Sequence, residues 1–102
     1  MSMAVTVYIP TSFRRATSNR DRVEVTAIDV SRLLDQLEAS YGGLKGLVRD
    51  EGGEVHHHVN IYVNSEAIES LQGLRTPLKD GDEVTIIPAL AGGGRPLAVA
   101  AP

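Results

Sequence analysis

Cysteine is absent from this chain of 102 residues, and tryptophan is absent as well. Without cysteine the chain cannot form a disulfide, a thiolate metal site, an iron–sulfur ligand set or a cysteine nucleophile. Any sulfur chemistry must therefore use sulfur supplied from outside the chain. The remaining composition, 42% hydrophobic and 23% charged, is that of an ordinary globular domain, and the length suits one core.

An excess of positive charge is also missing, because ten Lys and Arg residues face thirteen Asp and Glu residues. A net charge of −3 offers no general basic field for nucleic acid, so we expect no nucleic-acid partner. One local cluster departs from this balance and contains Arg14, Arg15, Arg20 and Arg22. Acidic neighbours dilute it, and we interpret it as a solvated loop, with a docking surface as the alternative.

Long hydrophobic runs are missing too. No stretch approaches the roughly 20 apolar residues of a membrane span, and residues 1–10 lack the pattern of a secretion signal. We therefore expect a soluble, cytoplasmic protein without a membrane partner. Its organisation is predicted as one domain over residues 1–91 and a flexible tail over residues 92–102.

Four segments alternate between apolar and polar residues with the period of two that is typical of half-buried strands. They are residues 4–9, 22–27, 55–63 and 83–88. The first two are expected to form a hairpin across a polar loop at residues 11–21. Residues 64–67 and 79–82 are predicted turns, the second with a glycine at positive φ.

One helix is predicted between the second and third strands. Its apolar stripe has the spacing i, i+3, i+4, i+7, and its members are Val30, Leu33, Leu34, Leu37 and Tyr41. Asp29 is the expected N-cap. Gly42 and Gly43 are expected to end the helix through the left-handed conformation, and Leu44, Leu47 and Val48 to add a short helical turn.

Strands with one buried face and a single helix favour an α+β fold of the β-grasp, or ubiquitin-like, type. A mixed sheet of four to five strands would pack on the one main helix. The competing ferredoxin-like fold needs a second long helix, but residues 65–76 contain Gly73 and no sustained apolar stripe.

A distinctive motif lies close to the C-terminus: Asp80-Gly-Asp-Glu-Val-Thr-Ile-Ile-Pro-Ala-Leu-Ala-Gly-Gly93. This turn, strand and glycine pair resemble the ending of the MoaD/ThiS family of ubiquitin-like sulfur carriers. The segment His56-His-His-Val-Asn-Ile-Tyr-Val-Asn64 further resembles the CysO branch of that family. The resemblance covers residues 4–93.

The resemblance implies a protein co-substrate rather than an enzyme. The carboxylate of Gly93, in the tail motif Gly92, Gly93 and Gly94, would be adenylated by a ubiquitin-activating-type adenylyltransferase (ThiF/MoeB-like). That partner would use ATP and Mg²⁺, with no cofactor bound to this chain. Conversion to a thiocarboxylate would then deliver sulfur to an accepting synthase, in the biosynthesis of cysteine, a cofactor or a specialised metabolite.

The chain departs from the family pattern because it continues past the glycine pair as Gly94-Arg-Pro-Leu-Ala-Val-Ala-Ala-Pro102. A glycine in a peptide bond has no carboxylate to adenylate. We therefore expect a precursor that a peptidase, of the JAMM-type metalloprotease class, trims to Gly93. Two alternatives remain: Gly94 is the reactive residue, or the extension is an inert addition and the protein is not charged.

The sequence supports predictions for two further groups of residues. The histidines His56, His57 and His58 are predicted to be structural rather than metal-binding, because in a strand only the first and third share a side. The outward side chains of Tyr8, Tyr62 and Ile87, extended by Leu90, are predicted to form a partner-binding surface on the open face of the sheet.

Two other functions use the same fold. A ubiquitin-like modifier would be conjugated to other proteins through Gly93, and a plain β-grasp interaction module would leave its glycines inert. The sequence contains no nucleophile–base pair or acidic dyad that favours an independent enzyme.

Overall fold

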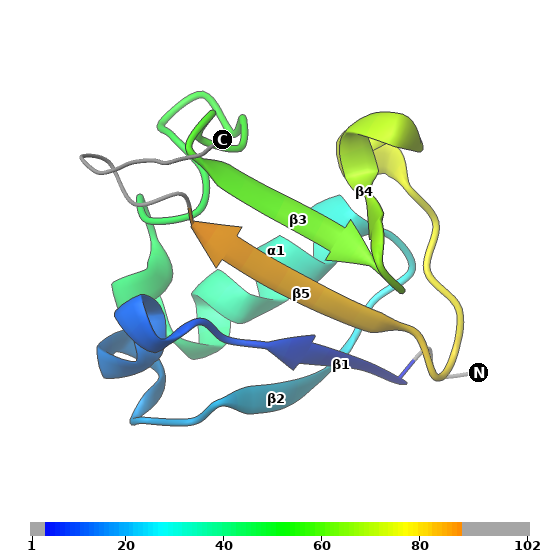
Figure 1. Cartoon of the computed structure of the whole chain (residues 1–102). Helices are drawn as coiled ribbons and strands as arrows, with labels where there is room; N and C mark the ends of the chain where they lie inside the picture. Colours follow the sequence, from blue (N-terminus) through cyan, green and yellow to red (C-terminus); the bar gives the residue numbers. More distant parts are fainter. Residues whose placement is uncertain (1–3, 89–102) are drawn as a thin grey trace, which may run out of the picture.

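A five-stranded mixed sheet lies across one α-helix in the computed structural model, which describes residues 4–88 (Figure 1). The strands are β1 (Ala4–Tyr8), β2 (Arg22–Thr26), β3 (Val59–Val63), β4 (Glu66–Ala67) and β5 (Glu83–Pro88), and the helix is α1 (Val30–Ser40). Four short 3₁₀ helices complete the described part: η1 (Thr11–Thr17), η2 (Gly42–Leu44), η3 (Ile68–Ser70) and η4 (Gly73–Arg75).

The strand order β2-β1-β5-β3-β4 places the last strand in the centre of the sheet. Strands β1 and β5 are parallel, while β1–β2, β3–β5 and β3–β4 are antiparallel. This arrangement confirms the β-grasp prediction. The ferredoxin-like alternative is wrong, because the segment that would have to supply its second helix forms β4, η3 and η4 instead.

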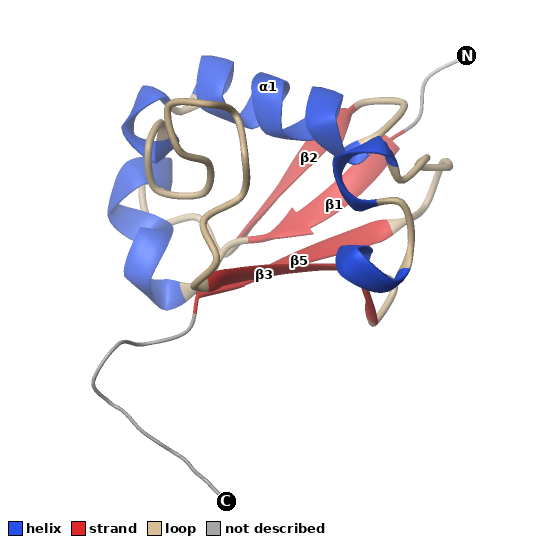
Figure 2. Cartoon of the chain, turned by 90° about the horizontal axis from the view of Figure 1, so that it is seen from above, coloured by secondary structure: helices blue, strands red, loops and turns tan. Residues whose placement is uncertain are grey.

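The core lies between the sheet and α1, which covers only one face of the sheet (Figure 2). The helix contributes four residues of its predicted stripe, namely Val30, Leu33, Leu34 and Leu37, whereas Tyr41 follows the helix as its C-cap and is half-buried. Strands β1, β2, β3 and β5 contribute their inward residues, such as Val7 of β1 and Ile86 of β5, which are almost completely buried. Asp29 caps the helix, since its side chain accepts a hydrogen bond of 2.7 Å from the backbone N–H of Arg32.

The predicted loop at residues 11–21 is wrong for its first seven residues, which form η1. Phe13 is 8% exposed and belongs to the hydrophobic core, and Thr17 is fully buried. The Thr17 hydroxyl lies 3.3 Å from the Arg14 carbonyl and 3.1 Å from the Arg20 carbonyl, so it bridges the two ends of the segment. A single apolar residue in a polar run gives no periodic signal, and tertiary packing determined the structure here.

The predicted role of Gly42 and Gly43 is also wrong, because neither glycine has a positive φ. The helix ends at Ser40, and the chain continues directly into η2. Gly43 is required for another reason: a Cβ there would come within 3.1 Å of the Ala16 Cβ. The glycine permits η1 and η2 to pack closely together.

The two predicted turns have different outcomes. Gly81 has a φ of +91°, as expected for the turn at residues 79–82. Asn64 and Ser65, with φ of 51° and 77°, form the other turn. The following residues, Glu66–Ala67, are not part of that turn but form β4 against the end of β3. No helix within residues 4–88 has the length and apolar character needed to cross a membrane.

Candidate functional site

One continuous row of side chains crosses the open face of the sheet, on the side away from α1. The strand registers pair Tyr8 with both Arg22 and Thr85, and they pair Tyr62 with both Thr85 and Ala67. Residues that are paired across strands project from the same face. The row therefore runs across all five strands in the order Arg22, Tyr8, Thr85, Tyr62 and Ala67.

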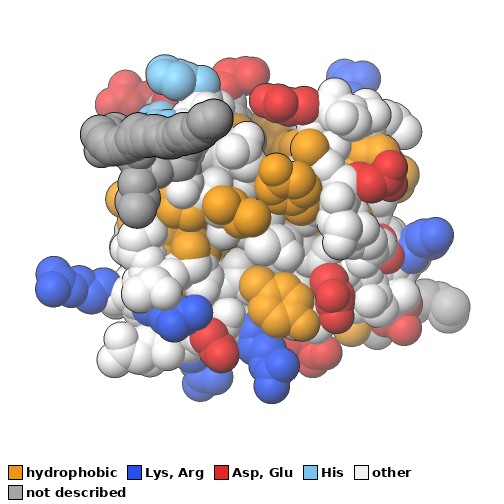
Figure 3. All heavy atoms as spheres, viewed as in Figure 1, with side chains coloured by type: hydrophobic (Ala, Val, Ile, Leu, Met, Phe, Trp, Pro, Cys, Tyr) orange, Lys and Arg blue, Asp and Glu red, His pale blue; other side chains and the backbone are white. Residues whose placement is uncertain are grey.

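Hydrophobic side chains gather along the middle of this face, over β1, β5 and β3 (Figure 3). Ile87 follows Thr85 by two positions on β5, so it projects from the same face, opposite Asn60 of β3. Ile87 is 46% exposed and is one of four large hydrophobic side chains that are exposed among residues 4–88. The three predicted surface residues that can be placed, Tyr8, Tyr62 and Ile87, thus lie together on one face.

The remaining predicted site residues, Leu90, Gly92, Gly93 and Gly94, lie outside the described residues. The last residue before them, Pro88, ends β5 beside Val59 of β3. The described part of the chain therefore ends on the central strand of the sheet, one position after Ile87. The apolar open face and this last described residue are contiguous.

A buried polar network holds β5 in position at its other end. The Asp82 carboxylate is 7% exposed, and it accepts hydrogen bonds from the Lys79 N–H at 2.8 Å and from Asn64 Nδ2 at 2.9 Å. Asn64 Oδ1 in turn accepts from the Glu83 N–H at 3.0 Å. This network ties the turn before β5 to the turn after β3 and so helps to fix their register. The register is what places Thr85 between the two tyrosines.

The three histidines lie in the loop before β3, with His57 and His58 in a turn, so the strand prediction for them is wrong. His56 Nε2 lies 2.9 Å from the Gly46 carbonyl, and the rings of His56 and His58 stack with centroids 5.1 Å apart. Within residues 4–88 no group of three or more His, Cys, Asp or Glu side chains could hold a metal ion. The geometry gives these histidines a structural role that fixes the loop before β3.

Arg49 anchors the same loop to the helix. Its guanidinium lies 2.8 Å from Asp35 and 2.9 Å from Glu38, both on α1. Hydrogen bonding to Glu38, with a further contribution from Asp35, raises the pKa of Arg49 against the opposing effect of burial. The ion pairs thus fasten the chain between α1 and β3, at a distance from the open face.

The model of the ThiS family matches residues 7–93, which is most of the chain. The chain belongs to the ThiS family.

Individual proteins are also similar to this chain. The sulfur carrier protein CysO of Mycobacterium tuberculosis is 42% identical over 93 residues, which cover 89% of this chain and all of CysO. The structure of the Amycolatopsis orientalis BexX/CysO complex contains a chain with 40% identity and a TM-score of 0.82, covering 88% of this chain and 100% of that one. The small archaeal modifier protein 1 of Methanosarcina acetivorans has 29% identity and a TM-score of 0.80, and the match covers 91% of this chain and 99% of that one.

Sequence reasoning missed three members of the row on the open face, namely Arg22, Thr85 and Ala67. Ala67 falls in a predicted turn, whereas Arg22 and Thr85 fall in predicted strands, where the alternation indicates an outward side chain. Their position next to a tyrosine depends on the strand order, because β1 lies between β2 and β5. The alternation was available in the sequence, but the adjacency was not.

Proposed function

We propose that this ThiS-family chain is a sulfur carrier and a co-substrate of partner enzymes rather than an enzyme itself. Its similarity to CysO over the full length of that protein supports this role. The observation that carries the proposal is that the family match extends to Gly93 and stops there. The reactive group would be the carboxylate of that glycine.

The proposed chemistry has two steps. A carboxylate oxygen of Gly93 attacks the α-phosphorus of ATP, bound with Mg²⁺ on a ThiF/MoeB-like adenylyltransferase, and pyrophosphate leaves. Sulfide then attacks the acyl carbon, and AMP leaves to give the thiocarboxylate. Glycines suit this tail because a residue without a Cβ permits close approach by the backbone of the partner.

The domain would supply the docking surface for that reaction. Tyr8, Tyr62 and Ile87 present an apolar face next to the start of the tail, and aromatic residues are frequent anchors at protein interfaces. CysO of Amycolatopsis orientalis crystallised as a complex with BexX, which supports a carrier that acts by docking. A sulfur-accepting synthase would be the second partner.

Charging would require removal of the residues after Gly93. The hydrophobic core residues found within residues 4–88 lie between positions 5 and 86, so trimming removes none of these. A JAMM-type zinc metalloprotease is the class of peptidase that we propose. Incubation of the full chain in an extract of the source organism should release the Gly93 form, and a zinc chelator should prevent this.

Intact-mass measurement tests the carrier function directly. The full chain and the form ending at Gly93 are incubated with a purified ThiF/MoeB-like enzyme, ATP, Mg²⁺ and sulfide. Only the form ending at Gly93 should gain the mass of one sulfur-for-oxygen exchange, and the same form with an amidated terminus is the control. Equal thiocarboxylate formation on the full chain would show that the precursor proposal is wrong. Thiocarboxylate formation on a form ending at Gly94 would assign the reactive carboxylate to Gly94 instead of Gly93.

A second candidate is a protein modifier joined to lysine side chains through Gly93. The similarity to the small archaeal modifier protein 1 supports it. Isopeptide adducts on other proteins, found by mass spectrometry of the purified chain from cells, would favour this function. A terminus that shows no ATP-dependent change would contradict both candidates and favour an inert interaction module.

A further inference from the structure

The arginine cluster of residues 14–22 is the one feature of the sequence that the proposed function does not use. Four arginines lie in these nine positions against one acidic residue, Asp21, although the chain as a whole has a net charge of −3. The segment covers part of η1 and the start of β2. We name Arg14, Arg15, Arg20 and Arg22 the cationic rim.

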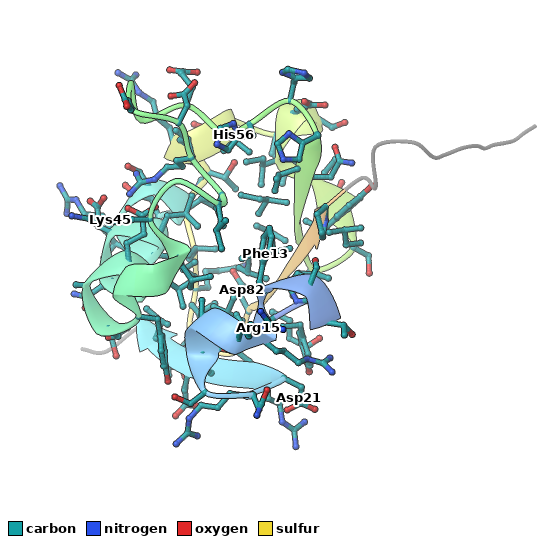
Figure 4. All side chains as sticks on the ribbon, turned by 90° about the vertical axis from the view of Figure 1, so that its left-hand side faces the viewer. Phe13, Arg15, Asp21, Lys45, His56 and Asp82 are labelled. Atoms are coloured by element: carbon teal, nitrogen blue, oxygen red, sulfur yellow. The ribbon has the colours of Figure 1, made fainter. Side chains whose placement is uncertain are left out.

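The topology places the cationic rim at the edge of the sheet from which the tail leaves. Because β1 and β5 are parallel, η1, which follows β1, lies at the same edge as Pro88. Strand β2 is antiparallel to β1, so its first residue, Arg22, lies there too. Figure 4 looks onto this edge, with Arg15 and Asp21 on its outer surface.

The side chains of the cationic rim are available to a partner. Arg15, Arg20 and Arg22 are exposed, and Arg14 is partly buried with its Nε 3.3 Å from the Ile9 carbonyl. Within residues 4–88 the only ion pairs are those of Arg49 with α1, so no arginine of the rim forms an ion pair with an acidic side chain of the described domain.

The cationic rim is continuous with the apolar open face. Arg22 is the direct cross-strand neighbour of Tyr8, which begins the apolar part of the row. A protein interface commonly combines an apolar centre with a polar border, and the open face and the rim have this arrangement. Nucleic acid fits less well, because Asp21 interrupts the arginines, Glu24 follows them and the overall charge is negative.

We infer that the cationic rim docks on an acidic surface of the adenylating partner, beside the entrance that receives the tail. The inference rests on the proposed function. Opposite charges at the border of an interface mainly accelerate the encounter and fix the orientation, rather than strengthen the final contact. The rim would therefore guide the tail into the partner and would not affect the chemical step.

The test reverses two charges of the rim in the form ending at Gly93. The variant R15E/R22E is compared with R32E/R75E, which changes the net charge equally but alters exposed residues on α1 and η4. ATP-dependent pyrophosphate release by the purified ThiF/MoeB-like enzyme is measured as a function of carrier concentration and salt. In low salt, R15E/R22E should lower kcat/KM by about tenfold with kcat unchanged, because electrostatic steering acts on association.

Salt provides the second readout. The difference between R15E/R22E and the unmodified carrier should shrink as salt rises, whereas R32E/R75E should follow the unmodified carrier throughout. Equal effects of the two variants, or a loss in kcat instead of kcat/KM, would overturn the inference. If R15E/R22E is adenylated at an unchanged rate but binds single-stranded RNA more weakly, the rim would be assigned to nucleic-acid binding. If the unmodified carrier is not adenylated at all, it is the proposed function that fails.

Discussion

Tyr8 and Tyr62 lie on opposite sides of the same residue, Thr85, although they are far apart in the sequence. Tyr8 comes from β1 and Tyr62 from β3, and β5 enters between them with the tail at its end. The β-grasp connectivity therefore brings the proposed docking surface and Pro88, the last described residue, together through one central strand. A partner that binds the proposed surface would lie beside Pro88.

Ile87 should contribute to docking and not to folding. We expect Ile87→Asp to lower kcat/KM for adenylation by at least about tenfold, because burial of an isoleucine side chain contributes about 1.5–3 kcal/mol and a carboxylate would be desolvated in its place. Thermal unfolding should change little, since the side chain is 46% exposed. The measurement is pyrophosphate release by the adenylating partner, with the form ending at Gly93.

Thr26→Asp is the matched control for Ile87→Asp, because Thr26 is exposed on the edge strand β2 and lies away from the apolar residues. It adds the same charge to the same face of the sheet. The variant should have a kcat/KM within about twofold of that of the unmodified carrier, because residues at the border of an interface contribute little to binding. If both variants slow adenylation equally, the added negative charge alone explains the result, and the apolar surface is not the docking site.

Phe13 should be a major stabilising residue of η1. Removal of a buried phenylalanine side chain leaves a cavity, so Phe13→Ala should lower the free energy of unfolding by about 3 kcal/mol. Urea denaturation measures the loss. The neighbouring exposed residue Ser12 is the control, and Ser12→Ala should change stability by less than about 0.5 kcal/mol. A small effect at Phe13 would indicate that η1 does not pack on the core.

The Asp82 network should stabilise the turn before β5. Asp82→Ala removes a buried acceptor from the Lys79 N–H and from Asn64 Nδ2, and hydrogen bonds to a charged group contribute about 1.5–3 kcal/mol. We expect a loss of about 2 kcal/mol in urea denaturation. Asp21→Ala, on an exposed aspartate, should be close to neutral. Hydrogen exchange of the β5 amides should also accelerate in the Asp82 variant, and unaltered exchange there would argue against a role in holding β5.

Arg49 should stabilise the loop before β3 without making stability depend on pH in the usual range. Arg49→Met removes the ion pairs with Asp35 and Glu38 and should lower the free energy of unfolding by about 1–2 kcal/mol. Lys45→Met, on an exposed residue of the same loop, is the control.

The sign of the pH dependence follows from the raised pKa of Arg49. A base with a raised pKa in the folded state contributes its full stability below its unfolded pKa, and this contribution is lost only as the pH rises through the folded value. Both values lie far above neutrality, so the difference between Arg49→Met and the unmodified protein should be constant between about pH 6 and pH 9. A difference that varies across this range would assign the effect to another titrating group.

Some parts of the candidate site were predictable because they depend on short-range patterns. The alternation in β1, β3 and β5 assigned Tyr8, Tyr62 and Ile87 to the outward face, and the structure confirms that orientation. The pattern failed where one contact between distant segments determines the conformation. Phe13 gave η1 a core residue within a polar run, and the close approach of Ala16 explains Gly43 better than a helix stop does.

The sequence by itself determined which residues face inward, where α1 begins, and that a glycine pair follows the last strand. These features depend on side-chain periodicity and local capping, which are properties of adjacent residues. Only the tertiary structure decided that Tyr8, Thr85 and Tyr62 are neighbours and that the arginines of residues 14–22 lie at the edge where the tail leaves. Strand order joins segments that are distant in the chain, and it is set by how the whole sheet packs on the helix.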